Sequence, residues 1–426
     1  MPERNGHVLL GVNALILGYL PAAWKSPRLT ADAFHSGDYW RQIGAIAERG
    51  TLDALFLADS PSLGNPGQDA NPAKLDPTVT WAHVARHTSH IGLIATASTT
   101  FNDPFELAER ILTLDVVSGG RAGWNLVTSR DPQAAANFGL DGVPTREERY
   151  ARGAEFADAV VGLWDSARTG QEFSLDGEHL RVSGRLRPPA SPQGRPVLFQ
   201  AGGSPQGRAL AGRLADGVFT AELTTETAVP HYQLVKDAAQ QYGRTRDEVK
   251  ILPGLLLSLG STEEEARRRS DELHEASPAA YSARWLSQAI GFDVSTLDLD
   301  EKFPAEVLDA PLDPATFTGS IGFRESILQK IRATGPTVRE YLRETRYSGS
   351  GHGGFVGTPE QLADRIEEWY RLGAWDGVNL QPDVLLEGLE VIADEVVPIL
   401  RRRGLYRHEY ETSTLRGHFQ AAGPSA

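Results

Sequence analysis

The feature that most constrains the fold of this chain is a repeated alternation of short apolar runs with amphipathic helical stretches. The runs have the length and the β-branched and aliphatic content of buried strands, and the stretches between them are long enough for crossover helices. This order favours an α/β fold with a parallel sheet. Eight runs are present, the number that closes a (β/α)8 TIM barrel, at residues 8–17, 53–59, 91–98, 122–128, 196–202, 216–221, 250–260 and 376–381.

Two stretches break this alternation. Residues 129–145 form a long polar connection after the fourth run, and residues 261–356 form a much larger insertion after the seventh, with helical patterns at 281–292 and 325–342. In a barrel, the connections that follow the strands form the rim of the active site, so we expect the insertion to lie over the mouth as a lid. Residues 1–426 are therefore expected to form one TIM-barrel domain with a large helical insertion.

Composition and charge exclude several classes of function. The net charge is −14 and Lys and Arg form no long stripe, so nucleic acid is not an expected partner. The sequence shows no secretion signal pattern and no apolar run of membrane-span length, so we expect a cytoplasmic protein without membrane contact. With no cysteine, and with His83 and His87 lacking a third ligand nearby, no metal site is expected. Redox chemistry would then need a bound cofactor.

Polar side chains occur at the carboxyl ends of the first four predicted strands. They are Asn13, Asp59, Ser98 with Thr99, and Asn125. Because these strand ends meet at the mouth of a barrel, we expect the side chains to line a cofactor site. The alternative in each case is a local role: Asn125 satisfies backbone groups inside the barrel, Asp59 caps the next loop and Ser98 bonds its own backbone.

A glycine-rich turn, "QAGGSPQGRALAGR" (200–213), follows the fifth run. Ser204 and Pro205 are placed as the N-cap and first residue of a helix. Backbone N–H groups of Gly202, Gly203 and Ser204, together with the helix N-terminus, suit a phosphate group. The alternative is a tight turn before a well-capped helix.

His352 stands among glycines in "SGSGHGGFVG", where the insertion returns to the barrel. A histidine over the mouth is suited to acid/base chemistry or to substrate contact. The alternative is a structural residue in a glycine-rich hinge. Thr358, Pro359 and Gln361 follow, and this spacing predicts a capping box that starts a helix rather than a second phosphate loop.

Several of these motifs resemble a known family. "SGGRAGWNLVTS" (118–129), "NFG" (137–139), "ERYARGAEF" (148–156) and "FVGTPEQLADRI" (355–366) resemble the flavin-dependent monooxygenases of the bacterial luciferase superfamily. The resemblance points to the branch of nitrilotriacetate monooxygenase, dibenzothiophene sulfone monooxygenase and pristinamycin IIA synthase. It implies a TIM barrel that takes reduced FMN from a separate NAD(P)H:FMN reductase, uses O₂ to oxygenate a small organic substrate, and forms a homodimer or homotetramer.

The resemblance also implies roles for individual residues. Flavin-lining positions are matched by Asp59, Thr99, Asn125 and Tyr150, the phosphate loop by Gly203 with Ser204, and a catalytic histidine by His352. Arg146 stands where relatives often have histidine beside the pocket, and we place it among the cofactor-binding residues. Tyr19 and Leu20 stand at a second such position. The substrate is therefore expected to differ from those of the named relatives.

Three further expectations concern the charge of the substrate, the C-terminal segment and the alternative functions. Arg146, Arg121 or Arg324 can line the pocket against an anionic substrate. The C-terminal segment 403–426 is expected to pack on the outside or on a partner subunit. The alternative functions are a deazaflavin-dependent oxidoreductase of the same superfamily, which transfers hydride without O₂, and a non-catalytic flavin-binding protein.

Overall fold

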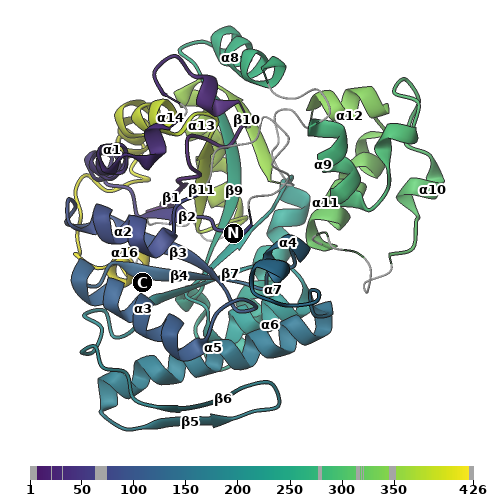
Figure 1. Ribbon diagram of the computed structural model, residues 1–426. Helices are drawn as coiled ribbons and strands as arrows, with labels where there is room; N and C mark the ends of the chain where they lie inside the picture. Colours follow the sequence, from purple (N-terminus) through teal and green to yellow (C-terminus); the bar gives the residue numbers. More distant parts are fainter. Residues whose placement is uncertain are drawn as a thin grey trace.

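Eight parallel strands close into a barrel, as the sequence predicts (Figure 1). The computed structural model describes residues 7–20, 22–30, 32–62, 74–276, 281–312, 317, 319, 321–344 and 352–421. Around the barrel the strands are β9 (Lys250–Leu259), β11 (Gly377–Pro382), β1 (Leu9–Asn13), β2 (Ala54–Leu57), β3 (Gly92–Ser98), β4 (Ala122–Val127), β7 (Val197–Ala201) and β8 (Gly217–Thr220). Pairing of β8 with β9 completes the ring.

Helices between successive strands surround the barrel. They are α1 (Gly37–Arg49), α2 (Pro77–Ala85), α3 (Pro104–Ser118), α4 (Pro132–Asn137), α5 (Arg146–Thr169), α6 (Pro205–Leu214), α7 (Thr225–Gln241), α13 (Pro359–Leu372), α14 (Leu385–Val391) and α15 (Val397–Arg402). Local signals fix their ends: Gly119 ends α3 in the left-handed conformation, with φ 75°. The predicted capping box at Thr358 and Gln361 starts α13. None of the described helices combines the length and apolar character needed to cross a bilayer.

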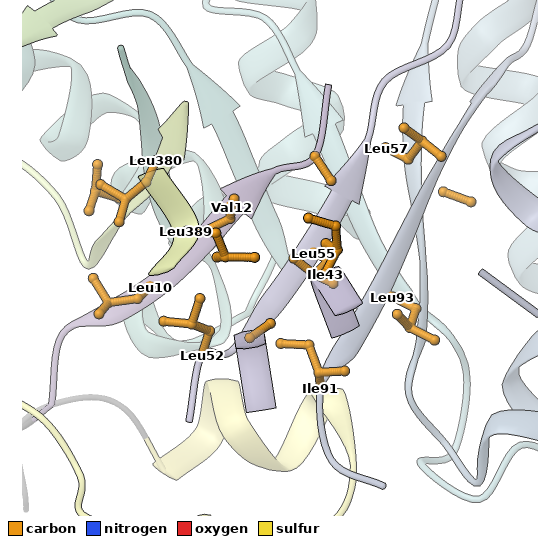
Figure 2. Close-up of a cluster of buried hydrophobic side chains, with 14 of the residues drawn as sticks. Leu10, Val12, Ile43, Leu52, Leu55, Leu57, Ile91, Leu93, Leu380 and Leu389 are labelled. Carbon is orange, nitrogen blue, oxygen red and sulfur yellow. The ribbon is translucent and has the colours of Figure 1, made fainter. Parts of the chain in front are cut away.

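Outward-facing side chains of the strands form the main core against these helices (Figure 2). Alternate residues of a strand point to opposite faces, so one set meets the helices and the other fills the barrel. The outward set includes Leu10, Val12, Leu55, Leu57, Leu93 and Leu380, which pack with Ile43 of α1 and Leu389 of α14. This packing holds the strand ends in fixed positions around the mouth.

The C-terminal helix α16 (Leu415–Ala421) fills the opposite end of the barrel. Leu415 and Phe419 are buried in one cluster with inward-facing residues such as Leu9 and Phe199. Gly92 leaves space for this helix, because an added Cβ would lie 2.4 Å from Cδ1 of Leu415. The expectation that this segment packs outside or on a partner is therefore wrong for residues 415–421: small inward residues at the strand starts leave a gap that its apolar face fills.

A ninth strand, β10 (Gly353–Gly357), was not predicted. Residues 250–253 of β9 pair with β8, and residues 255–259 pair with β10. β10 therefore continues the edge of β9 beyond the end of β8. Its glycine-rich sequence carries little strand signal, so only pairing with β9 identifies it. A two-stranded hairpin of β5 (Phe173–Asp176) and β6 (Arg181–Gly184), also unpredicted, lies between α5 and β7.

The insertion contributes to the barrel and also builds a core of its own. α8 (Glu263–Glu275) packs against β9 and β10. Beside the barrel lie α9 (Tyr281–Ile290), α10 (Ala305–Leu308), α11 (Ile321–Thr334) and α12 (Val338–Glu344) (Figure 1). Residues between 286 and 341 form a second buried cluster. The predicted helix at 325–342 is two helices, because Gly335 adopts φ 58° and Pro336 follows it.

Candidate active site

A cavity of about 580 Å³ opens at the carboxyl ends of β4, β7 and β8. Its walls come from the strand ends and from α5, α6, α7 and α11. The lining residues used below are Val127, Arg130, Tyr150, Gly202, Gly203, Arg208, Phe219, Glu222, Glu226, His231, Glu325, Ser326, Gln329 and His352. Because Glu325, Ser326 and Gln329 belong to α11, the insertion supplies one wall of the cavity.

The predicted glycine turn lies on the wall formed by β7 and α6. Gly202 has φ 131°, a conformation that favours glycine. Ser204 is the N-cap of α6, and its hydroxyl accepts a hydrogen bond from the N–H of Gly207 at 3.1 Å. The Tyr150 hydroxyl lies near the turn, 3.7 Å from where a Cβ on Gly202 would be. The turn, the start of α6 and Tyr150 are thus brought together at the cavity.

Asn125 is buried inside the barrel on β4, two residues before Val127, which lines the cavity. Its Nδ2 donates to the Thr96 hydroxyl at 3.0 Å. Its Oδ1 is buried and has no hydrogen-bond partner among the described residues. The amide therefore keeps one acceptor for a ligand that enters the barrel mouth.

Other buried amides surround the same space. Among the described residues, Oδ1 of Asn13 and both polar side-chain atoms of Asn379 and Gln381 lack hydrogen-bond partners. Oε1 of Gln200 also lacks one, but this side chain lies on the α6 side of β7, next to Gly207. Asn379 and Gln381 are 0% exposed. Buried polar groups are normally paired, so this cluster fits a polar ligand. Sequence reasoning missed Gln200, Asn379 and Gln381, although the alternation in "GVNLQP" places the last two on one face of β11.

His352 immediately precedes β10 and lies at the base of the cavity. Its side chain is near Gln381, because a Cβ added to Gly254 would lie 2.6 Å from Nδ1 of His352 and 2.7 Å from Nε2 of Gln381. The ring of Tyr19 lies 6.4 Å away in an edge-on arrangement. Burial lowers the pKa of His352 to about 4, although a hydrogen bond with the Thr220 backbone acts in the opposite direction. The imidazole is therefore neutral at pH 7.

Six predicted site residues lie outside the described lining of this cavity: Asn125 and Ser204, described above, and Asp59, Ser98, Thr99 and Arg146. The Ser98 hydroxyl accepts the N–H of Thr100 at 3.0 Å, the local role considered above. Thr99 is buried, and its carbonyl accepts a hydrogen bond from Arg152. Asp59 follows the end of β2, and burial raises the pKa of its carboxyl group. The Arg146 guanidinium lies 5.5 Å from the ring centroid of Tyr150, and Tyr150 in turn lines the cavity.

A histidine–carboxylate pair that sequence reasoning missed lies on the cavity wall. Nδ1 of His231 in α7 is 2.9 Å from Oε1 of Glu222, which follows β8. Both residues line the cavity. The only sequence signal is a pair of ionisable residues after a strand and in the next helix, and their contact depends on the fold. Among the described residues, no group of three or more His, Asp or Glu side chains is arranged to hold a metal ion.

Comparison with known families agrees with this arrangement. Residues 19–375 match the model of a family described as luciferase-like monooxygenase. The chain belongs to this family. The match covers six of the eight barrel strands, all except β1 and β11, together with the insertion, so the residues that line the cavity lie within it.

Relatives of this luciferase-like monooxygenase extend over its full length. N-acetyl-S-(2-succino)cysteine monooxygenase of Bacillus subtilis (strain 168) is 38% identical over 100% of this chain and 99% of that protein. Nitrilotriacetate monooxygenase component A of Aminobacter aminovorans is 37% identical, with coverage of 99% and 98%. The structure of EDTA monooxygenase from Chelativorans sp. BNC1 superimposes with a TM-score of 0.79 at 32% identity, covering 98% of each chain. The chain is thus an oxygenating enzyme.

Two of the three candidate arginines have structural roles in this luciferase-like monooxygenase. Arg121 is buried near the start of β4 and donates to the carbonyls of residues 85, 88, 91 and 118. Arg324 donates to the carbonyls of Ile290 and Ala310 within the insertion. Both side chains satisfy backbone carbonyls and neither is among the residues that line the cavity, so the expectation that they line the pocket is wrong. Arg130, which was not predicted, lines it instead.

Proposed function

We propose that this enzyme is the oxygenating component of a two-component system. It takes reduced FMN from a separate NAD(P)H:FMN reductase and uses O₂ to add one oxygen atom to a small organic substrate. When bound, reduced FMN supplies the electrons and the site at which O₂ is activated. Relatives over the full chain are named monooxygenases, which favours this function over hydride transfer to a deazaflavin or flavin storage.

The observation that carries the proposal is the meeting of two kinds of group at one cavity. The turn of Gly202, Gly203 and Ser204 presents backbone N–H groups and the start of α6, which suit a phosphate. Asn125 and the amides beneath the mouth present unpartnered donors and acceptors, which suit a planar heterocycle with polar edges. A flavin mononucleotide has both parts, so the residues present fit this cofactor.

His352 is proposed to act on the substrate. Burial keeps its imidazole neutral at pH 7, so a ring nitrogen is able to accept a proton at the base of the cavity. Asp59, Ser98, Thr99 and Arg146 are proposed to support the flavin from positions around Asn125 and Tyr150. α11 is proposed to act as part of a lid that excludes water when ligands are bound.

The rim of the cavity supports a substrate with carboxylate groups. Arg130 lines the cavity, and Arg146 and Arg149 are electrostatic neighbours of it. In the described part of the chain, Arg149 donates to the Pro144 carbonyl and Arg146 lies over the Tyr150 ring, and neither contact is with a carboxylate. The relatives named for nitrilotriacetate, EDTA and N-acetyl-S-(2-succino)cysteine act on compounds that carry such groups.

The test is a coupled oxygenation assay. The purified enzyme, a generic flavin reductase, NADH, FMN and O₂ are incubated with amines and thioethers that carry carboxylates, and products are analysed by mass spectrometry. We expect tight binding of reduced FMN, and either a mass gain of one oxygen or the fragments of carbon–nitrogen or carbon–sulfur cleavage. Binding of the deazaflavin without binding of reduced FMN would contradict the proposal.

A further inference from the structure

The His231–Glu222 pair is fixed in position next to the glycine turn. The Glu222 side chain is 5% exposed and contacts Nδ1 of His231 at 2.9 Å. The Thr220 hydroxyl also donates to Oε1 of Glu222, at 3.2 Å. A carboxylate at Nδ1 orients the ring and keeps a proton on that nitrogen. Nε2 is therefore the atom left to contact a ligand.

Nε2 of His231 is placed to contact a ligand beside the turn. It is buried and has no hydrogen-bond partner among the described residues. The imidazole lies against Gly203, where an added Cβ would be 2.9 Å from Cε1 of His231, and both residues line the cavity. A buried polar atom normally has a partner, so the ring completes its hydrogen bonding when a ligand fills this part of the cavity.

We propose that His231, held by Glu222, binds the phosphate of the flavin and makes the enzyme select FMN over riboflavin. This inference rests on the proposed function. With Nδ1–H donated to Glu222 and Nε2–H donated to a phosphate oxygen, the protonated imidazole bridges two anions, and each bond is charge-assisted. The turn supplies backbone N–H groups on one side of the phosphate, and His231 supplies a cation on the other.

Charged groups of both signs surround this pair. Glu226 of α7 and Glu325 of α11 line the same cavity. Arg208 of α6, whose guanidinium donates to the Gly203 carbonyl, and Arg130 beyond β4 line it as well. Among these groups Glu222 is the one shown in direct contact with the ring, so its removal is expected to release the orientation of the imidazole.

Anaerobic titration with reduced FMN and reduced riboflavin tests the inference, because riboflavin lacks the phosphate. His231→Gln should weaken binding of reduced FMN by about 10- to 100-fold and change binding of reduced riboflavin by less than about twofold. Glu222→Gln is the second variant. It should also weaken binding of reduced FMN and leave binding of reduced riboflavin nearly unchanged, because His231 then loses the carboxylate that orients its ring.

The outcomes are distinguishable. Retained riboflavin binding shows that each variant is folded. An equal loss of affinity for both flavins, or no loss for His231→Gln, overturns the inference while the proposed function stands. If the wild type binds neither reduced flavin, the proposed function itself fails.

Discussion

The imidazole of His352 packs against the ring of Phe219, with ring centroids 5.0 Å apart, at the base of the cavity. Phe219 belongs to β8, and His352 immediately precedes β10. Both β8 and β10 pair with the same edge of β9. The contact therefore depends on the return of the insertion into the barrel. It buries a titratable ring against an aromatic one, and the first two predictions follow from this.

The first prediction concerns stability and pH. Burial lowers the pKa of His352 to about 4 from an ordinary value of 6.5. Between these values the unfolded chain binds more protons than the folded one, so this residue's contribution to stability is lost as the pH falls from 6.5 through 4. We expect His352→Gln to reduce that loss by roughly 1.4 kcal/mol per unit of pKa difference. Urea unfolding at pH 7 and pH 5 measures it, and equal pH dependence in both proteins would contradict it.

The second prediction separates chemistry from hinge motion at the same place. His352→Ala should lower the oxygenation rate by roughly 10²- to 10⁴-fold, the scale of a lost acid/base group, and leave reduced FMN affinity nearly unchanged. Gly353→Ala is the comparison, because its Cβ would lie 3.1 Å from the Glu222 carbonyl and disturb the segment without removing the imidazole. A larger effect of Gly353→Ala than of His352→Ala on product yield would favour the hinge.

The parts of this fold that were predictable depend on local patterns. Each barrel strand gave its own apolar run, and the start of α13 followed from Thr358 and Gln361. β10 and α16 were not placed, because "GGFVG" becomes a strand only by pairing with β9, and Leu415 finds its place only against Gly92. Propensity and periodicity carry no information on such long-range contacts.

The same distinction holds at the site. The glycine turn and Asn125 were predictable, since a turn composition and a polar residue in a strand are visible in a few residues. The meeting of His352 with Gln381 over Gly254 joins three distant segments. The contact of His231 with Glu222 and Gly203 joins three consecutive elements of the barrel, and it too depends on how these elements pack. For this reason only part of the polar lining of the cavity was predictable from the sequence.

The third prediction concerns the glycine turn. Gly203→Val should weaken binding of reduced FMN far more than it lowers the melting temperature, because the new side chain enters the cavity at the His231 ring. Gly142→Val is the matched control, because an added Cβ at Gly142 has no heavy atom within 4 Å. Fluorescence titration and thermal unfolding of both variants provide the comparison. Parallel losses of affinity and stability in Gly203→Val would indicate a turn with a structural role only.

The last prediction concerns α16. Phe419 is 4% exposed, and its ring lies 5.5 Å from that of Phe199, centroid to centroid, at the closed end of the barrel. Phe419→Ala should therefore lower the free energy of unfolding by about 3–5 kcal/mol, the usual cost of removing a buried phenyl group. Val117→Ala on the exposed face of α3 is the control, since Val117 is 64% exposed and should change stability by less than about 0.5 kcal/mol.

Denaturant unfolding at several protein concentrations, with light scattering on the same samples, distinguishes packing of α16 inside its own barrel from packing of α16 at a subunit interface. If α16 stabilises the barrel from within, the loss is independent of concentration and the expected homodimer or homotetramer persists; a concentration-dependent loss accompanied by dissociation would instead place the segment at a subunit interface.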